Sequence, residues 1–320
     1  MKKRSSESKA EKGKTKAKSS ASPGPWVKSK ISAAHIDILR QEGTLPSGWR
    51  RPGDEEIPRP QAGERVMHFD VVRRGVSFPI HPFLRGLLCE YGAQLHHFTP
   101  NSLLIVSCFA TLCECWLGVF PHWGLFRRVF VLRKQATEKS KSISAIGGIG
   151  IQARPDVEFF NFRLLASVRG WREKWFYAQD QCSETQRFGL AEFSVAPPCK
   201  RKSWDHEMTE AEMLEANRLL ERVSALRSSD GLTGVDIMLT WLRRRVQPLR
   251  ARAEPMWTYS GAGDLTRATA EEFSSVELRA HVKALTHQSA EELEACIRDP
   301  PTPPFSADNP LPEVCSLTLI

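Results

Sequence analysis

Histidines and cysteines gather in the middle of the sequence, where their types would first suggest a zinc site. A zinc knuckle needs two cysteines separated by two residues, with a histidine and a further cysteine closely following. Only one residue separates Cys113 from Cys115, and on a helix their side chains point about 200° apart. We therefore favour small thiols buried in an apolar helix, and we predict no metal site and no cofactor. The residues considered are His96, His97, Cys108, Cys113, Cys115 and His122.

The other patterns that could support catalysis are incomplete. No nucleophile motif accompanies His96 and His97, and the glycines at 147–150 are not followed by the Gly-Lys-Ser/Thr of a phosphate-binding loop. A two-metal nuclease or transposase would need three carboxylates. The spacing of the candidates in this sequence does not distinguish such a catalytic set from unrelated carboxylates. Those candidates are Asp70, Asp156, Asp180 and Glu192. Signatures of aspartic proteases and reverse transcriptases are also missing, so the sequence predicts a protein that is not an enzyme, with no catalytic residues.

Aromatic and basic residues alternate at one place in the chain. Trp171 and Trp175 are interleaved with Arg169, Arg172 and Lys174, as in proteins that stack single-stranded nucleic acid on aromatic side chains. A strand with half-buried aromatic residues gives the same pattern. We favour the buried strand and keep all five residues as candidate nucleic-acid contacts.

The net charge of +8 comes from one end of the chain. Residues 1–30 contain ten Lys/Arg and two Glu, whereas the other 290 residues contain 35 basic and 35 acidic residues. Scattered basic side chains neutralise phosphates without reading sequence and in a salt-sensitive way. The candidate contacts of this tail are Lys2, Lys3, Arg4, Lys9, Lys12, Lys14, Lys16 and Lys18. The alternatives are a nuclear import signal, at residues 2–4 or 200–202, or a solvated, solubilising tail.

Caps, turns and periodicity predict the elements that would position these residues. Helices are expected over 32–41, 82–91, from Asn101 or Ser102 to about 118, and over 123–130, 209–227, 235–246 and 289–298. Strands or strand-and-turn segments are expected over 66–72, 147–151, 157–162 and 175–177. The helix after Pro100 is apolar nearly all round and should be buried.

These elements predict an α+β fold that is predominantly α-helical, with one mixed domain carrying a small sheet, a helical extension and disordered termini. An apolar fraction of 41%, with nine Trp and sixteen Phe, excludes a chain that is disordered throughout. The expected parts are a disordered basic tail, a short helix with a Pro-rich linker, the mixed domain, the helical extension and a Pro-rich flexible C-terminus. Their boundaries are 1–30, 31–62, 63–195, 203–300 and 301–320.

The eight cysteines are expected to be reduced thiols. The sequence starts with lysines and serines rather than the apolar core of a signal peptide. Its most apolar stretch, Leu103–Cys113, has about half the length of a membrane span and is followed by Glu114. We therefore expect a nuclear or cytoplasmic protein that is not secreted, has no transmembrane segment and has no membrane partner.

Several longer motifs agree with one another at their spacing. They are RGLLCEYGAQLHHFTPNS at 85–102, LCECWLG at 112–118, PH at 121–122, GG at 147–148, GWREKWFY at 170–177, WLRRRVQPL at 241–249 and MWTYSG at 256–261. Together they resemble the transposase-like domain of plant gypsy-type transposons, over roughly residues 40–265. The resemblance implies an origin in a transposable element and supplies no catalytic residue to carry over.

Three functions follow as hypotheses. The first is a non-enzymatic structural or interaction protein, similar in kind to the capsid-region product of a gypsy-type retrotransposon, with itself or other proteins as partners. The alternative is a nucleic-acid-binding module that uses the basic N-terminal tail without sequence preference. The third and least favoured is a metal-dependent transposase or nuclease.

Overall fold

The computed structural model describes residues 26–242, except for 43, 47, 79, 118, 138–139, 156, 158–167, 181–188, 202–203 and 205–206, together with the single residues 276, 280, 283 and 285. The expected helix at 289–298 lies outside the described residues, as do the last turn of the helix expected over 235–246 and nearly all of the segment expected at 157–162.

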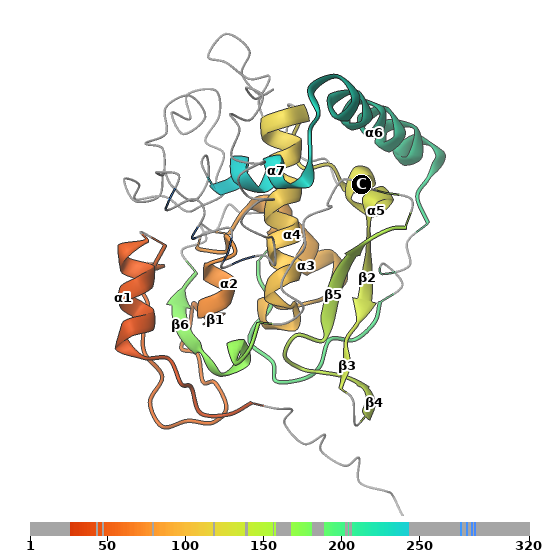
Figure 1. Cartoon of the computed structure of the whole chain (residues 1–320). Helices are drawn as coiled ribbons and strands as arrows, with labels where there is room; N and C mark the ends of the chain where they lie inside the picture. Colours follow the sequence, from red (N-terminus) through yellow and green to blue (C-terminus); the bar gives the residue numbers. More distant parts are fainter. Residues whose placement is uncertain are drawn as a thin grey trace, which may run out of the picture.

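A buried helix, α4 (Pro100–Thr111), runs through the middle of the molecule (Figure 1), and all of its residues except Asn101 are buried. Thr99 caps this helix, in place of the expected Asn101 or Ser102: the Thr99 hydroxyl accepts a hydrogen bond from the Ser102 N–H at 3.3 Å, and Pro100 occupies the first helical position. A buried π-helical segment, η2 (Leu112–Leu117), continues α4. The predicted buried helix is confirmed.

The helical stretch Pro100–Leu117 is 18 residues long, and its length and composition would allow it to cross a membrane. In this fold 94% of it is buried inside the protein, as expected for the central helix of a core. The apolar stretch is therefore longer than the sequence analysis took it to be. Glu114 does not interrupt it, because the chain stays helical through this residue in η2.

Short antiparallel pairs of strands flank α4. Met67 lies opposite Phe176 in the first pair, and Leu132 lies opposite Ile151 in the second. The pairs are β1 (Glu64–His68) with β6 (Trp175–Gln179), β2 (Phe130–Lys134) with β5 (Ile149–Ala153), and β3 (Ala136–Thr137) with β4 (Ser140–Ile143).

The expected strand at 66–72 is wrong after His68. The chain turns there into a short helix, α2 (Phe69–Val72), and the Phe69 N–H donates to the carbonyl of Lys174 at 2.9 Å. Apolar residues at 69, 71 and 72 are all buried in this helical turn, which a short apolar run does not distinguish from a strand.

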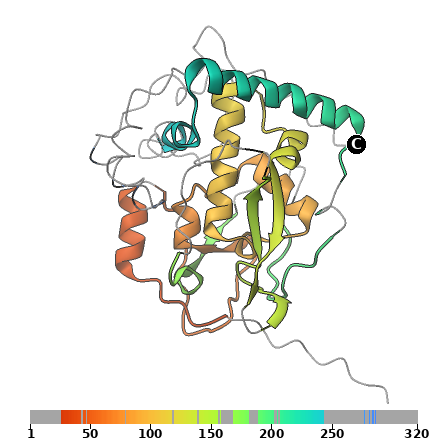
Figure 2. The same ribbon diagram turned by 45° about the vertical axis from the view of Figure 1, so that its right-hand side comes forward.

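The remaining helices cover the core from outside. They are α1 (Ala33–Gln41), α3 (Pro82–Tyr91), α5 (Trp123–Val129), α6 (Glu210–Asp230) and α7 (Gly234–Trp241). The longest, α6, lies across α5, and α7 packs against α4 (Figure 2). One continuous cluster of buried side chains joins both helices to the mixed domain, so the expected helical extension shares the core of that domain. The predicted fold class, mostly helical with small two-stranded sheets, is confirmed.

Residues 26–31, here called the N-terminal strap, are packed on the core. The predicted disordered tail, residues 1–30, is therefore too long at its C-terminal end. Trp26 is only 6% exposed. The Trp175 indole N–H donates to the carbonyl of Val27 at 3.0 Å, and the Lys30 N–H donates to the carbonyl of Glu173 at 2.6 Å. One large aromatic side chain in a polar segment is therefore enough to fix the chain to the core, because burying it removes much apolar surface from water.

The Pro-rich linker also lies against the core. Arg50 and Tyr177 exchange backbone hydrogen bonds at 2.9 and 3.0 Å, which places this part of the linker along β6. The Arg50 guanidinium then forms an ion pair with the buried Glu64, at 2.6 Å. The linker is irregular, as its prolines predict, but it is a bound part of the fold.

Candidate functional site

The six residues considered for zinc are distributed over different elements. His96 and His97 lie in η1 (Leu95–His97), His122 caps α5, and the three cysteines lie in α4 and η2. Burial raises the pKa of the Cys108 and Cys113 thiols well above its usual range, which keeps both thiols protonated. Across the described part of the chain, no three side chains of His, Cys, Asp or Glu come together in a group that could hold a metal ion.

Two titratable side chains meet inside the core, at His81 and Glu114. His81 Nε2 and Glu114 Oε1 are 2.8 Å apart and both side chains are buried. The Phe83 N–H donates to His81 Nδ1 at 3.1 Å, so His81 Nε2 carries the proton and donates it to the carboxylate. The π-helical turn of η2 carries Glu114 to this position. This pair ties the start of α3 to the end of the central helix.

Three buried histidines form a second cluster, beneath the N-terminal strap. The ring centroids of His96 and His97 are 4.4 Å apart. The Trp26 ring lies 5.2 Å from the ring of His96 and 6.1 Å from that of His68. The Nε2 atoms of His68 and His96 have no hydrogen-bond partner among the described residues. The strap therefore covers a site whose polar atoms are only partly satisfied by the described residues.

Burial keeps these three histidines neutral. It lowers the pKa of His68 to about 3 and that of His97 to about 4, and it holds the pKa of His96 well below its usual range. Hydrogen bonding agrees with a neutral His97, because Nδ1 accepts from the Gln94 N–H at 3.0 Å while Nε2 donates to the carbonyl of Ala196 at 3.2 Å.

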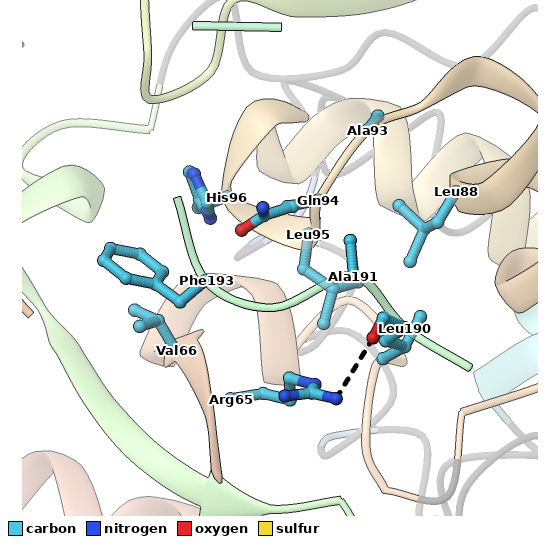
Figure 3. Close-up of a pocket in the computed structure, with 10 residues that line it drawn as sticks. All are labelled: Arg65, Val66, Leu88, Ala93, Gln94, Leu95, His96, Leu190, Ala191 and Phe193. Carbon is cyan, nitrogen blue, oxygen red and sulfur yellow. Dashed lines mark hydrogen bonds between the residues drawn. The ribbon is translucent and has the colours of Figure 1, made fainter. Parts of the chain in front are cut away.

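A short irregular stretch, the 189–196 segment, crosses this site (Figure 3). A pocket of about 30 Å³ lies beneath it, with room for about one or two water molecules. Phe193 points toward Val66 and His96, and Arg65 donates to the carbonyl of Leu190 at 3.2 Å. The pocket is lined by Arg65, Val66, Leu88, Ala93, Gln94, Leu95, His96, Leu190, Ala191 and Phe193.

The side chains of the site hold the 189–196 segment by its backbone. The Gln94 amide donates to the carbonyl of Glu192 at 2.7 Å and accepts from the Ser194 N–H at 3.2 Å. An amide that gives one hydrogen bond and takes one behaves toward a peptide as a neighbouring strand would. In this fold the Gln94 amide thus binds the backbone of the chain's own 189–196 segment.

The aromatic side chains of the predicted nucleic-acid site are inside the core. Trp171 is 6% exposed and Trp175 is fully buried, so neither ring is open to a base in this structure. Arg169 and Arg172 are exposed, whereas Lys174 lies 3.2 Å from the buried Asp70. The burial favours the strand interpretation of this pattern, and the two arginines stay candidate contacts. The eight basic tail residues from Lys2 to Lys18 lie outside the described residues.

The carboxylates considered for metal catalysis are likewise separated. Asp70 lies among the basic groups of Arg74 and Lys174, and Asp180 forms ion pairs with Arg65 and Arg85. Glu192 is exposed on the 189–196 segment, and Asp156 is outside the described residues. Both aspartates are therefore paired with basic side chains of the protein.

Sequence reasoning missed the residues that build this site. Trp26 offered a signal, because it is a single large aromatic residue in a tail of lysines, serines and small residues. Gln94 and Phe193 offered none, since both lie in segments without periodicity, and Gln94 binds Ser194, which is 100 positions away in the sequence.

Comparison with protein families gives one match, over residues 66–134, to the family described as "Putative gypsy type transposon". The match runs from β1 to the end of β2 and includes His68, η1 and all of α4 and η2. No curated protein and no solved structure matches the chain. The resemblance outside residues 66–134 stays a prediction. Residues 66–134 of this chain therefore match the model of a gypsy-type transposon domain.

Proposed function

We propose that this protein is a non-enzymatic interaction protein derived from a gypsy-type element, similar in kind to a capsid-region product, and that its folded body binds protein, including copies of itself. The observation that carries this proposal is the site at η1, where polar side chains bind polypeptide backbone. A site of this kind reads the shape and hydrogen-bonding pattern of a chain, and one apolar pocket adds selectivity.

The chemistry-bearing residues around the site support the same proposal. His97 and Gln94 hold the 189–196 segment, and Asp180 holds both Arg65 and Arg85. His81 and Glu114 tie α3 to η2. In each case a group that could take part in catalysis makes a contact between two parts of the chain.

Self-association tests the proposal directly. We expect the mass measured by light scattering, for the full chain over a wide range of concentration, to rise above that of one chain of 36.1 kDa. Sedimentation equilibrium at low and high salt separates apolar from electrostatic association, because screening weakens only the latter. A strict monomer at every concentration would contradict the self-association part of the proposal.

A nucleic-acid-binding module is the second candidate function, favoured by the placement of the strap. Trp26 fixes the start of the described chain to the core, so the basic residues that precede it are tethered to one point on the folded body. A tethered basic segment would bind phosphates with little sequence preference.

Fluorescence anisotropy with labelled single-stranded RNA and duplex DNA tests this second function. We compare the full chain with a chain of residues 26–320, which keeps Trp26, at two salt concentrations. We expect binding that weakens steeply with salt and is lost with residues 1–25. Equal binding by both chains would indicate that the folded body binds the nucleic acid. The variants Arg169→Ala and Arg172→Ala would then test the two exposed arginines.

A further inference from the structure

We propose that the folded body itself binds duplex DNA, through a basic β-ribbon that works together with the N-terminal tail on the same duplex. The basic β-ribbon is the hairpin of residues 130–154, which contains β2, β3, β4 and β5. The proposal rests on the second candidate function, because it gives the folded body a share in a contact assigned there to the tail alone.

The basic β-ribbon is one continuous hairpin. β2 pairs with β5 as far as Lys134, which lies opposite Ile149. Beyond this pair, the Gln135 N–H donates to the carbonyl of Gly148 at 2.8 Å, and the Gln135 carbonyl accepts from the Ser144 N–H at 3.4 Å. β3 and β4 continue the hairpin at the end of the molecule away from α6 (Figure 1, Figure 2). The ribbon is therefore a narrow, two-stranded element.

The charge of the ribbon is predominantly basic. Residues 130–154 contain five basic residues and one acidic residue, although the chain after residue 30 has equal numbers of both. Arg133 and Lys134, at the end of β2, are exposed, and neither has a hydrogen-bond or ion-pair partner among the described residues. Successive side chains of a strand point to opposite faces, so the ribbon offers a cation on each face.

Two further basic elements meet the middle of the ribbon, at Gly147. The Gly147 N–H donates to the carbonyl of His96 at 2.8 Å, and the His96 ring lies 5.2 Å from that of Trp26, where the basic tail joins the folded body. A Cβ atom at Gly147 would lie 3.6 Å from Nη2 of Arg172. Glu173, the acidic neighbour of Arg172, is paired with a lysine of the strap at 2.6 Å. Three basic elements that are far apart in sequence are thus close together in the fold.

Duplex DNA is the ligand that fits these observations. The major groove of B-form DNA, about 12 Å wide, admits a two-stranded ribbon, and cations on both faces of the ribbon can reach phosphates on both sides of that groove. Single strands are held mainly by stacking on aromatic rings, but Trp171 and Trp175, the tryptophans beside Arg172, are buried. The major groove of duplex RNA is too deep and narrow for such an element.

Fluorescence anisotropy of labelled duplex DNA with the full chain tests the ribbon. Arg133→Ala combined with Lys134→Ala should raise Kd at least about tenfold and make the dependence of log Kd on log salt shallower by about two, as for loss of two phosphate contacts. Arg40→Ala combined with Arg218→Ala is the matched control, because it removes the same charge from exposed positions of α1 and α6. We expect the control to change Kd by less than about twofold. Urea midpoints equal to that of the native chain verify that both variants are folded.

A second variant and two other ligands sharpen the test. Arg172→Ala should raise Kd for duplex DNA about fivefold, because Arg172 lies beside the ribbon. Single-stranded DNA and duplex RNA of the same sequence should bind the native chain at least about tenfold more weakly than duplex DNA does.

The outcomes separate the ribbon from the tail and from protein binding. A loss of affinity with a shallower salt dependence in the ribbon variant, and not in the control, supports the proposal. Equal Kd values for the native chain and the ribbon variant, or an equal loss in the control, overturn it and leave the tail as the contact. Tighter binding of single-stranded DNA or duplex RNA also overturns it. Absence of binding to any nucleic acid overturns both this proposal and the second candidate function, and leaves the interaction protein standing.

Discussion

Two buried regions of this protein use histidine in opposite ways. Where α3 meets η2, His81 is satisfied at both nitrogens, by the Phe83 N–H and by Glu114. Beneath the N-terminal strap, the Nε2 atoms of His68 and His96 have no hydrogen-bond partner among the described residues, and a pocket lies beside His96. Both regions lie in the segment that matches the transposon family. Only the second region also has contacts from the strap and from the 189–196 segment.

In the first region, elements of one segment of the chain bind each other. The second region instead binds segments that come from distant parts of the sequence. The first region is built by α3 and η2, and its residues His81 and Glu114 are 33 positions apart within the matched segment. The second is completed by Trp26 and Phe193, which come from far outside residues 66–134. An imperfectly satisfied polar site is costly to bury, and proteins retain such sites mostly where they have a function.

Breaking the first region should have the largest effect on stability. Glu114→Ala leaves the buried His81 N–H without its acceptor and opens a cavity, and we expect a loss of about 4 kcal/mol in the free energy of unfolding. Urea denaturation measures it. Glu215→Ala is the matched control, because Glu215 pairs with His122 at 3.3 Å on the surface, and it should change stability by less than about 1 kcal/mol. Similar losses for both would contradict the comparison.

Removing the anchor of the strap should have the next largest effect. We expect Trp26→Ala to cost about 3 kcal/mol, at the lower end for a buried tryptophan because the strap can detach locally. Deletion of residues 1–25 should leave the urea midpoint unchanged. If Trp26→Ala were also without effect, the strap would not be part of the stable core.

Lowering the pH should reduce the stability of the fold through the histidines of the second region. The folded-state pKa values of His68 and His97, about 3 and 4, lie below the unfolded value of about 6.5, so the unfolded chain binds more protons. Stability is therefore complete above about pH 6.5 and falls as the pH decreases toward 4, by up to about 1.4 kcal/mol per pH unit for each histidine.

Denaturation midpoints of the native chain and of His97→Gln between pH 7 and 5 measure this dependence. The variant lacks one titrating group and should lose stability less steeply over that interval. Carboxylates are common to both proteins, so the difference in slope reports the histidine. Parallel curves would show that His97 does not titrate with unfolding.

Local sequence signals determined most of the elements. Thr209 and Glu212 form a capping box at the start of α6, and Gly92 ends α3 in the left-handed conformation, at φ 59°. The apolar surroundings of Cys108 and Cys113 predicted buried thiols, as found. These features depend on residues within a turn or two of one another, so their physics is contained in a short stretch of sequence.

Tertiary structure alone decided the site. A short apolar run does not show whether it is a strand or a helical turn, so the sequence alone could not assign α2. In the structure, the Phe69 N–H at the start of α2 donates to the carbonyl of Lys174. The strap contacts Trp175, whose indole N–H donates to the carbonyl of Val27, whereas Trp171 packs against His68. Gln94 binds a segment 100 residues away. Sequence therefore determined most of the helices and the family match over residues 66–134. The site arose from contacts between distant segments, whose pairing no local pattern encodes.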